Sequence, residues 1–179
     1  MPGNKYRVYL AGFSRDGISM NPSLEPTLHK AMYHWGIWVE PKNSQGEGQL
    51  FHVEHHEPMN SSSGPIPGGW RYETRTSSAR TSVRHVGRIM IGKLPSGTMP
   101  DDMEAFLASN VALPREGSDE DCITWTRSAI LALQQKGWVE QFDVDECLDA
   151  AYETFKRWYA SGGWVKANKK ESFVKRKFP

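Results

Sequence analysis

The sequence predicts a single α+β domain in which helices pack on an antiparallel sheet of about five strands. Three observations predict this class. A chain of 179 residues is long enough to bury one core without disulfides. Before Pro100, short runs of strand-forming residues are separated by turn residues, whereas after Pro100 apolar residues recur at helical spacing. Because the strands come first and do not alternate with the helices, the pattern favours an antiparallel sheet.

Five runs rich in β-branched and aromatic residues are expected to form the strands: residues 6–13, 34–40, 49–56, 70–75 and 82–94. The turn-rich segment between the second and third runs predicts a hairpin. A short helix is expected over residues 26–33. Residues 58–69 are rich in Ser, Pro and Gly, which indicates a mobile surface loop.

Three helices are expected after Pro100, over residues 101–109, 119–136 and 143–159. Ser118 is a suitable N-cap for the second helix, and Gly137 is a suitable stop. The third helix has its apolar residues on one face, namely Val144, Leu148, Ala151, Phe155 and Trp158. Cys147 lies on that face, so we expect it to be a core residue.

The composition indicates a protein of a reducing compartment. The two cysteines form neither a zinc spacing nor a disulfide framework. The N-terminal sequence lacks the pattern of a signal peptide, and no apolar run is long enough to span a membrane. A cytoplasmic protein without a membrane partner is therefore expected.

The charge is unevenly distributed along the chain. Residues 165–179 carry six basic residues and one acid, whereas the net charge of the whole chain is only +1. We therefore expect a catalytic-type domain over residues 1–164 and a basic C-terminal tail over residues 165–179. Such a tail either binds an acidic partner such as RNA or is a solvated chain end.

Histidines on the second and third predicted strands form a candidate site. Alternation places His34, Gly36 and Trp38 on one face of their strand, and His52 and Glu54 on one face of the next.

If these strands pair, His34 and one of His52 or His56 can be neighbours, and a helix packed on that face could bring Cys122 to them. A thiol beside an imidazole that a second polar group orients is a usable nucleophile.

The motifs HWGIWV, FHV and DCITW resemble those of circularly permuted NlpC-like papain-fold enzymes, the group that contains lecithin:retinol acyltransferase-like proteins. In that group the motifs are similar to HYGIYL, a downstream histidine, and NCE at the start of the cysteine helix. The resemblance covers roughly residues 6–138. It implies a permuted papain-like fold and acyl transfer through a thioester, with Cys122 as nucleophile, His34 as base and His52 as the residue that orients the base. No cofactor and no metal are implied.

The segments YRVYLAGF and DCITWTRSAILALQQKGWV are similar to small fungal proteins of natural-product gene clusters, including a family that makes arginine-containing cyclodipeptides from aminoacyl-tRNA. The DDxxE motif of that family is missing, since Asp101, Asp102 and Glu104 make only DDxE. This similarity implies an aminoacyl donor, tRNA as a partner of the basic residues, and a role in secondary metabolism.

Other interpretations of the same residues stay open. Asp119, Glu120 and Asp121 would oppose ionisation of Cys122, which is otherwise a small buried residue at a capped helix start. His52, Glu54, His55 and His56, with His34 nearby, are ligand types that zinc or iron could use in a metal-dependent enzyme.

A non-catalytic domain is the alternative from another functional class. In it, tryptophans would form an aromatic pocket for a small molecule. The residues expected to bind a ligand, in either an enzyme or a binding domain, are Trp35, Trp38, Glu54, Trp70 and Trp125. The sequence contains no phosphate-binding glycine loop, no serine nucleophile elbow and no dinucleotide motif.

Overall fold

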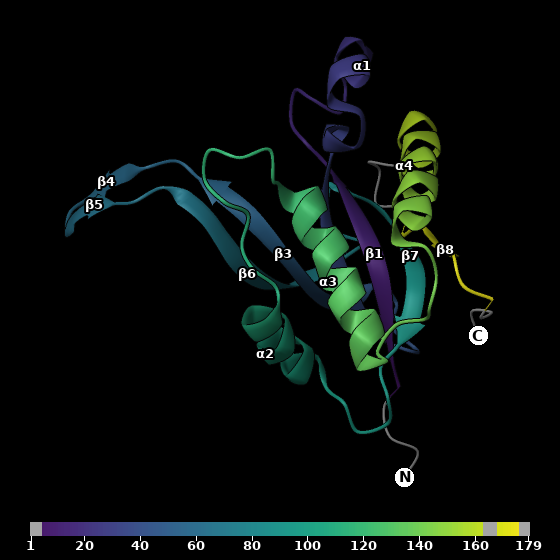
Figure 1. Cartoon of the computed structure of the whole chain (residues 1–179). Coiled ribbons are helices and arrows are strands. Elements are labelled where there is room, and N and C mark those ends of the chain that lie inside the picture. Colours follow the sequence, from purple (N-terminus) through teal and green to yellow (C-terminus); the bar gives the residue numbers. More distant parts are fainter. Residues whose placement is uncertain (1–4, 163–167, 176–179) are drawn as a thin grey trace.

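A computed structural model describes residues 5–162 and 168–175 of the chain. It is a mixed α+β structure (Figure 1). In chain order the elements are β1 (Tyr6–Ser14), η1 (Pro22–Leu24), α1 (Glu25–Leu28), η2 (His29–Met32), β2 (Tyr33–Pro41), β3 (Glu47–His56), β4 (Met59–Ser61), β5 (Gly64–Ile66), β6 (Gly69–Ser78), β7 (His85–Lys93), α2 (Pro100–Asn110), α3 (Cys122–Lys136), α4 (Val144–Ala160) and β8 (Lys170–Ser172).

The described strands form a six-stranded sheet in the order β6-β3-β2-β1-β7-β8. All neighbours are antiparallel except β7 and β8, which are parallel. The expected α+β class and the expected hairpin of β2 and β3 are confirmed, with Ile37 opposite Phe51.

Two segments differ from expectation. Residues 58–69, expected as a loop, contain the ribbon of β4 and β5 at the end of the long β3–β6 hairpin, which projects from the rest of the molecule (Figure 1). In the segment expected as a tail, Lys170–Ser172 add the sixth strand of the sheet. Residues 165–167 and 176–179 of that segment lie outside the described residues.

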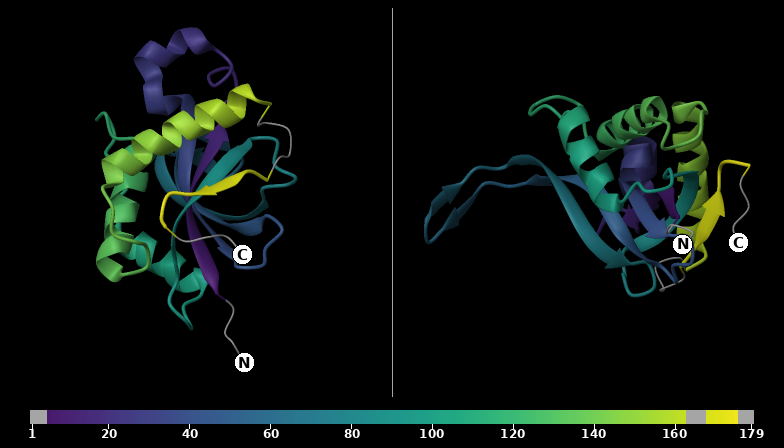
Figure 2. Two further views of the ribbon diagram at one scale, coloured as in Figure 1. Left: turned by 90° about the vertical axis from the view of Figure 1, so that its right-hand side faces the viewer. Right: turned by 90° about the horizontal axis from the view of Figure 1, so that it is seen from below.

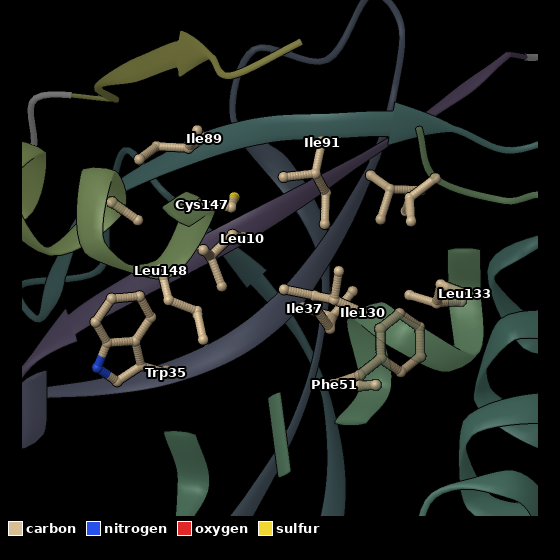
Figure 3. Packing of buried hydrophobic residues seen from close by; sticks show 14 of the residues in the cluster. Leu10, Trp35, Ile37, Phe51, Ile89, Ile91, Ile130, Leu133, Cys147 and Leu148 are labelled. Carbon is tan, nitrogen blue, oxygen red and sulfur yellow. The ribbon is translucent and has the colours of Figure 1, made fainter. Parts of the chain in front are cut away.

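Helices α2, α3 and α4 lie on one side of the sheet (Figure 2). Helix α3 packs on β2 and β3, and α4 packs on β7. The main core lies between these layers and is built from apolar side chains of the strands and helices (Figure 3). The apolar face predicted for α4 is part of this core, since Val144, Leu148, Ala151, Phe155 and Trp158 are all buried. Cys147 is also a core residue, as predicted.

The other side of the sheet carries a second, smaller cluster that includes Tyr9, Phe13 and Trp38. Beside it, Arg88 and Glu40 form a buried bidentate salt bridge, with donor–acceptor distances of 2.9 and 3.1 Å. Because Trp35 and Ile37 belong to the main core and Trp38 to the second cluster, the alternation predicted for β2 is confirmed.

Helix α3 begins later than predicted. Asp121, not Ser118, is the N-cap, and its carboxylate accepts hydrogen bonds from the N–H groups of Ile123 and Thr124. Ser118 instead lies in a turn before the helix. The predicted stop is confirmed, since Gly137 has φ of 75°, a conformation that glycine adopts without strain.

Among the described helices, none has both the length and the hydrophobicity that a membrane span requires.

Candidate functional site

A pocket opens where β2 and β3 separate. The two strands pair only from Ile37 and Phe51 to Val39 and Gln49, so His34 and His52 lie just beyond the paired region. The pocket has a volume of about 480 Å³. Its lining comes from the end of β1 and the following loop, from β2, β3 and β6, and from the start of α3.

His34, His52 and Cys122 all line this pocket, so the structure places the three predicted residues around one cavity. It does so in an unexpected way. Helix α3 packs on the face of Trp35 and Ile37, which is opposite to the face of His34 and His52. Cys122 and the histidines line the same pocket because β2 and β3 are no longer paired at this point.

The two imidazoles are directly hydrogen-bonded. His34 Nε2 lies 2.8 Å from His52 Nδ1, and the rings meet edge to face with centroids 5.0 Å apart. A carboxylate oxygen of Glu54 lies 3.7 Å from the same His52 nitrogen. His52 is almost fully buried, so its orientation is fixed by the surrounding structure. The contact therefore fixes the two rings relative to each other.

Both histidines are held neutral. Burial lowers the pKa of His34 to about 4, and the cations of Arg15 and Arg75 add to this. Burial also lowers the pKa of His52 to about 3, with His34 and Arg75 as further causes. Near neutral pH each ring therefore has one nitrogen that can accept a proton or a hydrogen bond.

The Cys122 thiol is protonated in the resting protein. Burial raises its pKa to about 12, and the Asp121 carboxylate also raises it. A backbone hydrogen bond at Trp35 and the Arg15 cation act in the opposite direction but are weaker than burial. The first position of a helix favours a thiolate, but this effect is smaller than the cost of removing the charged sulfur from water.

Only one of the three acids before Cys122 acts on the thiol directly. Asp121 caps α3 and lines the pocket. Glu120 is turned toward Arg115, which donates to it from the backbone and from the guanidinium. The concern that these acids oppose ionisation is therefore correct for Asp121.

Three of the five predicted ligand-binding residues are core residues instead. Trp35 and Trp38 are fully buried, and their indole N–H groups donate to the Lys30 carbonyl and to Glu40. Trp125 packs against Tyr72 in the main core. They were misassigned because a tryptophan has the same sequence signal in a core and in a pocket wall.

Glu54 and Trp70 do line the pocket, where Trp70 contacts the His55 ring edge to face.

Among the described residues, two groups of side chains are close enough to share a metal ion. One ligand atom from each of His34, His52 and Glu54 lies within 4.8 Å of the others, and the same holds for Glu54, His56 and Glu73. His56 and Glu73 are at present hydrogen-bonded to each other at 2.6 Å.

Sequence reasoning missed the arginines of the pocket, Arg15, Arg75 and Arg84. Arg75 had a usable signal. It alternates with Glu73, which is opposite His52 in the β3–β6 hairpin, so both face the same side as the histidine. Arg15 follows β1 in a loop, and no periodic pattern predicts where a loop residue points.

No curated protein and no solved structure matches the chain. A protein-family model matches residues 5–174, and that family is described as one of unknown function.

Proposed function

The chain belongs to this family, DUF6914, and we propose that it is an enzyme of cysteine-dependent acyl transfer or amide-bond chemistry on a small-molecule or aminoacyl donor. The observation that carries the proposal is that Cys122, His34 and His52 line one pocket. A thiol, a neutral imidazole and a second group that orients the imidazole are the parts that a thioester mechanism needs.

The neutral resting state makes His34 a general base. As the Cys122 sulfur attacks the carbonyl carbon of the donor, the thiol proton moves to a nitrogen of His34. The His34 imidazolium then protonates the leaving group as the bond between carbonyl carbon and leaving group breaks, which leaves a thioester on Cys122. An amine, alcohol or water then attacks the thioester carbonyl, passes its proton through His34 to the sulfur, and restores the thiol.

His52 fits the orienting role in this scheme. When His34 Nε2 carries a hydrogen, it donates to His52 Nδ1 and its other nitrogen is the proton acceptor. Once His34 is protonated, the Glu54 carboxylate favours the positive charge, because a carboxylate oxygen lies within 4.8 Å of a His34 nitrogen.

The backbone N–H groups at the start of α3 are poor candidates for an oxyanion hole. The N–H groups of Ile123 and Thr124 are already bonded to Asp121. The tetrahedral oxyanion therefore needs another donor.

A permuted papain-like fold is part of the same proposal. Two features support it: the chain order His34, His52, Cys122, and a cysteine at the first position of a helix that packs on the strands carrying the histidines.

The test is acylation of the protein by an activated ester such as p-nitrophenyl acetate, followed by intact mass and peptide mapping. We expect one acetyl group on Cys122, none on the Cys122→Ala variant, and an unchanged adduct on the matched Cys147→Ala variant. Substitution of His34 by Gln should slow the reaction at least about a hundredfold, the lower range for loss of a general base. An adduct that persists at full rate in Cys122→Ala would overturn the proposal.

A more specific version of the proposal is that the acyl donor is an aminoacyl-tRNA. The basic residues at 165–179 support it only through their charge. Binding of bulk tRNA that weakens with salt, together with transfer of the aminoacyl group to Cys122, is the expected result. Binding without transfer would exclude tRNA as the donor.

A metal-dependent enzyme is the second candidate, because His34, His52 and Glu54 converge. Their separations of 2.8 and 3.7 Å lie on either side of the spacing of about 3.3 Å between ligands of a tetrahedral zinc ion. Elemental analysis after zinc loading tests it. We expect stoichiometric zinc that is lost in His52→Asn if this candidate holds, and no stoichiometric metal if it does not.

A non-catalytic binding domain predicts a different result. It would bind a small molecule without any adduct on Cys122. Of the four tryptophans expected to form its aromatic pocket, only Trp70 lines the cavity, which counts against this alternative.

A further inference from the structure

Arginines from separate elements surround the pocket. Arg15 follows β1, Arg75 lies on β6, and Arg84 precedes β7. Carboxylates also line the pocket, and each of them has partners. Asp16 pairs with Arg84, Asp121 caps α3, and Glu54 lies 3.7 Å from both His52 and Arg75.

Arg15 differs from Arg75 and Arg84 in its ion pairing. Within the part of the chain that the structure describes, it belongs to none of the ion pairs. One of its guanidinium nitrogens, Nη1, donates to the Ala31 carbonyl, which leaves Nε and Nη2 as donors that no described residue accepts. A guanidinium has five N–H donors in a fixed plane, so most of the donor capacity of Arg15 remains available.

The Arg15 segment is held in position by its own contacts. The backbone N–H of Arg15 donates to the Ser19 hydroxyl at 2.8 Å, and that buried hydroxyl donates to the Met32 carbonyl. Together with the bond from Arg15 Nη1 to Ala31, this attaches the loop after β1 to the segment before β2. A cation fixed in this way binds an anion without a further loss of side-chain entropy.

Arg75 is also available for a ligand. Its contact with Glu54 is an ion pair at 3.7 Å, which is longer than a hydrogen bond. It shares the pocket with Arg15 and lies on the same hairpin face as His52.

We propose that the pocket is an anion-binding site that selects an acyl donor carrying a carboxylate or phosphate group, with Arg15 as the main contact and Arg75 as the second. That the bound molecule is an acyl donor rests on the proposed acyl transfer. The anion-binding site itself does not depend on that proposal. A guanidinium binds either group through two parallel N–H···O bonds. The histidines contribute no positive charge near neutral pH, because their pKa values are lowered, so the positive charge of the site comes from the arginines.

The first experiment measures binding without chemistry. Adipate, inorganic phosphate and the neutral adipamide are titrated by calorimetry into the native protein and into Cys122→Ala. We expect both proteins to bind one or both anions and not the diamide. Arg15→Gln should weaken anion binding at least about tenfold, and Arg75→Gln should weaken it less. The preferred anion identifies the group as carboxylate or phosphate.

Arg71→Gln is the matched control, because Arg71 is exposed on the same strand as Arg75 and does not line the pocket. It should bind the anions as the native protein does. Equal binding of adipate and adipamide, or unchanged binding in Arg15→Gln, would overturn the anion site.

The second experiment separates the two proposals. The N-acetylcysteamine thioesters of adipic acid and of hexanoic acid have the same chain length and differ in one carboxylate. We expect Cys122 to be acylated at least about tenfold faster by the adipoyl thioester, and this preference to disappear in Arg15→Gln.

If neither thioester acylates Cys122 while the anions still bind, acyl transfer fails and the anion site stands. If both thioesters acylate Cys122 equally in every variant, the anion site fails and acyl transfer stands.

Discussion

At the scale of single residues, the Cys122 thiol is governed by burial more than by its place at a helix start. The pKa of about 12 means that very little thiolate exists near neutral pH. The thiol of Cys147 is in the same state, since burial raises its pKa to about 12 as well. In the proposed mechanism, reactivity at Cys122 therefore depends on proton transfer to His34 while a carbonyl is being attacked.

We predict that iodoacetamide, which a thiolate attacks at the CH2–I carbon and not at a carbonyl, alkylates Cys122 slowly. The Cys147→Ala variant allows the reaction at Cys122 to be followed alone by intact mass. At pH 7.5 the rate should be at least about a hundredfold below that of N-acetylcysteine, because the thiolate fraction is that much smaller. A rate equal to that of the free thiol would mean that the thiolate is stabilised in the folded protein.

Asp121 has two effects that substitution can separate. Asparagine caps a helix as well as aspartate but has no charge. We expect Asp121→Asn to lower the pKa of Cys122 and to speed its alkylation, because a nearby negative charge is removed. Stability should change little.

Asp121→Ala is the comparison variant. It should also speed alkylation, but it should lose about 1 kcal/mol in urea unfolding because the cap is lost. Unchanged alkylation rates in both variants would show that the Asp121 charge does not reach the thiol.

At the scale of elements, the packing of α4 on the sheet depends on a close approach at Gly12 of β1. A Cβ atom at this position would lie 2.5 Å from the Phe155 ring, closer than two carbons can approach. We predict that Gly12→Ala lowers the free energy of unfolding by about 1 to 3 kcal/mol, measured with urea. The cost arises because the ring must move within a tightly packed core.

The double variant Gly12→Ala, Phe155→Leu tests the cause. Leucine makes room for the added methyl group, so the two changes together should cost less than the sum of their separate effects. Additive effects would show that the strain at Gly12 arises elsewhere.

At the scale of the whole molecule, a buried histidine links stability to pH. His85 is 2% exposed and packs between Phe13 and Trp38. Burial lowers its pKa to about 3, and the Arg88 cation adds to this, whereas an unfolded histidine titrates near 6.5. The unfolded chain therefore binds a proton between pH 6.5 and 3 that the folded chain does not bind.

We predict that this difference removes stability as the pH falls from 6.5 toward 3, by about 1.4 kcal/mol per pH unit for this histidine. Urea unfolding at several pH values compares the native protein with His85→Gln. The variant should lose less stability than the native protein between pH 6 and pH 4. Parallel curves for the two proteins would show that His85 takes up no extra proton on unfolding.

Much of the local structure could be predicted because it depends on neighbours in sequence. Period-two alternation predicted β1, β2 and β3, and helical spacing predicted α2, α3 and α4 to within a few residues. The ribbon of β4 and β5 was missed because its turn residues are also typical of loops. Lys170–Ser172 were missed because a three-residue strand pairs with β7 through contacts distant in sequence.

The sequence by itself determined which residues share a face of β2 and β3, and it placed Cys122 near the start of a helix. Only the tertiary structure decided which face α3 covers, that β2 and β3 separate beyond Ile37 and Phe51, and that Arg15 joins the pocket.

The physical reason is that alternation and capping are properties of one segment. Pocket shape, burial and therefore the pKa of a thiol depend on how distant segments pack together.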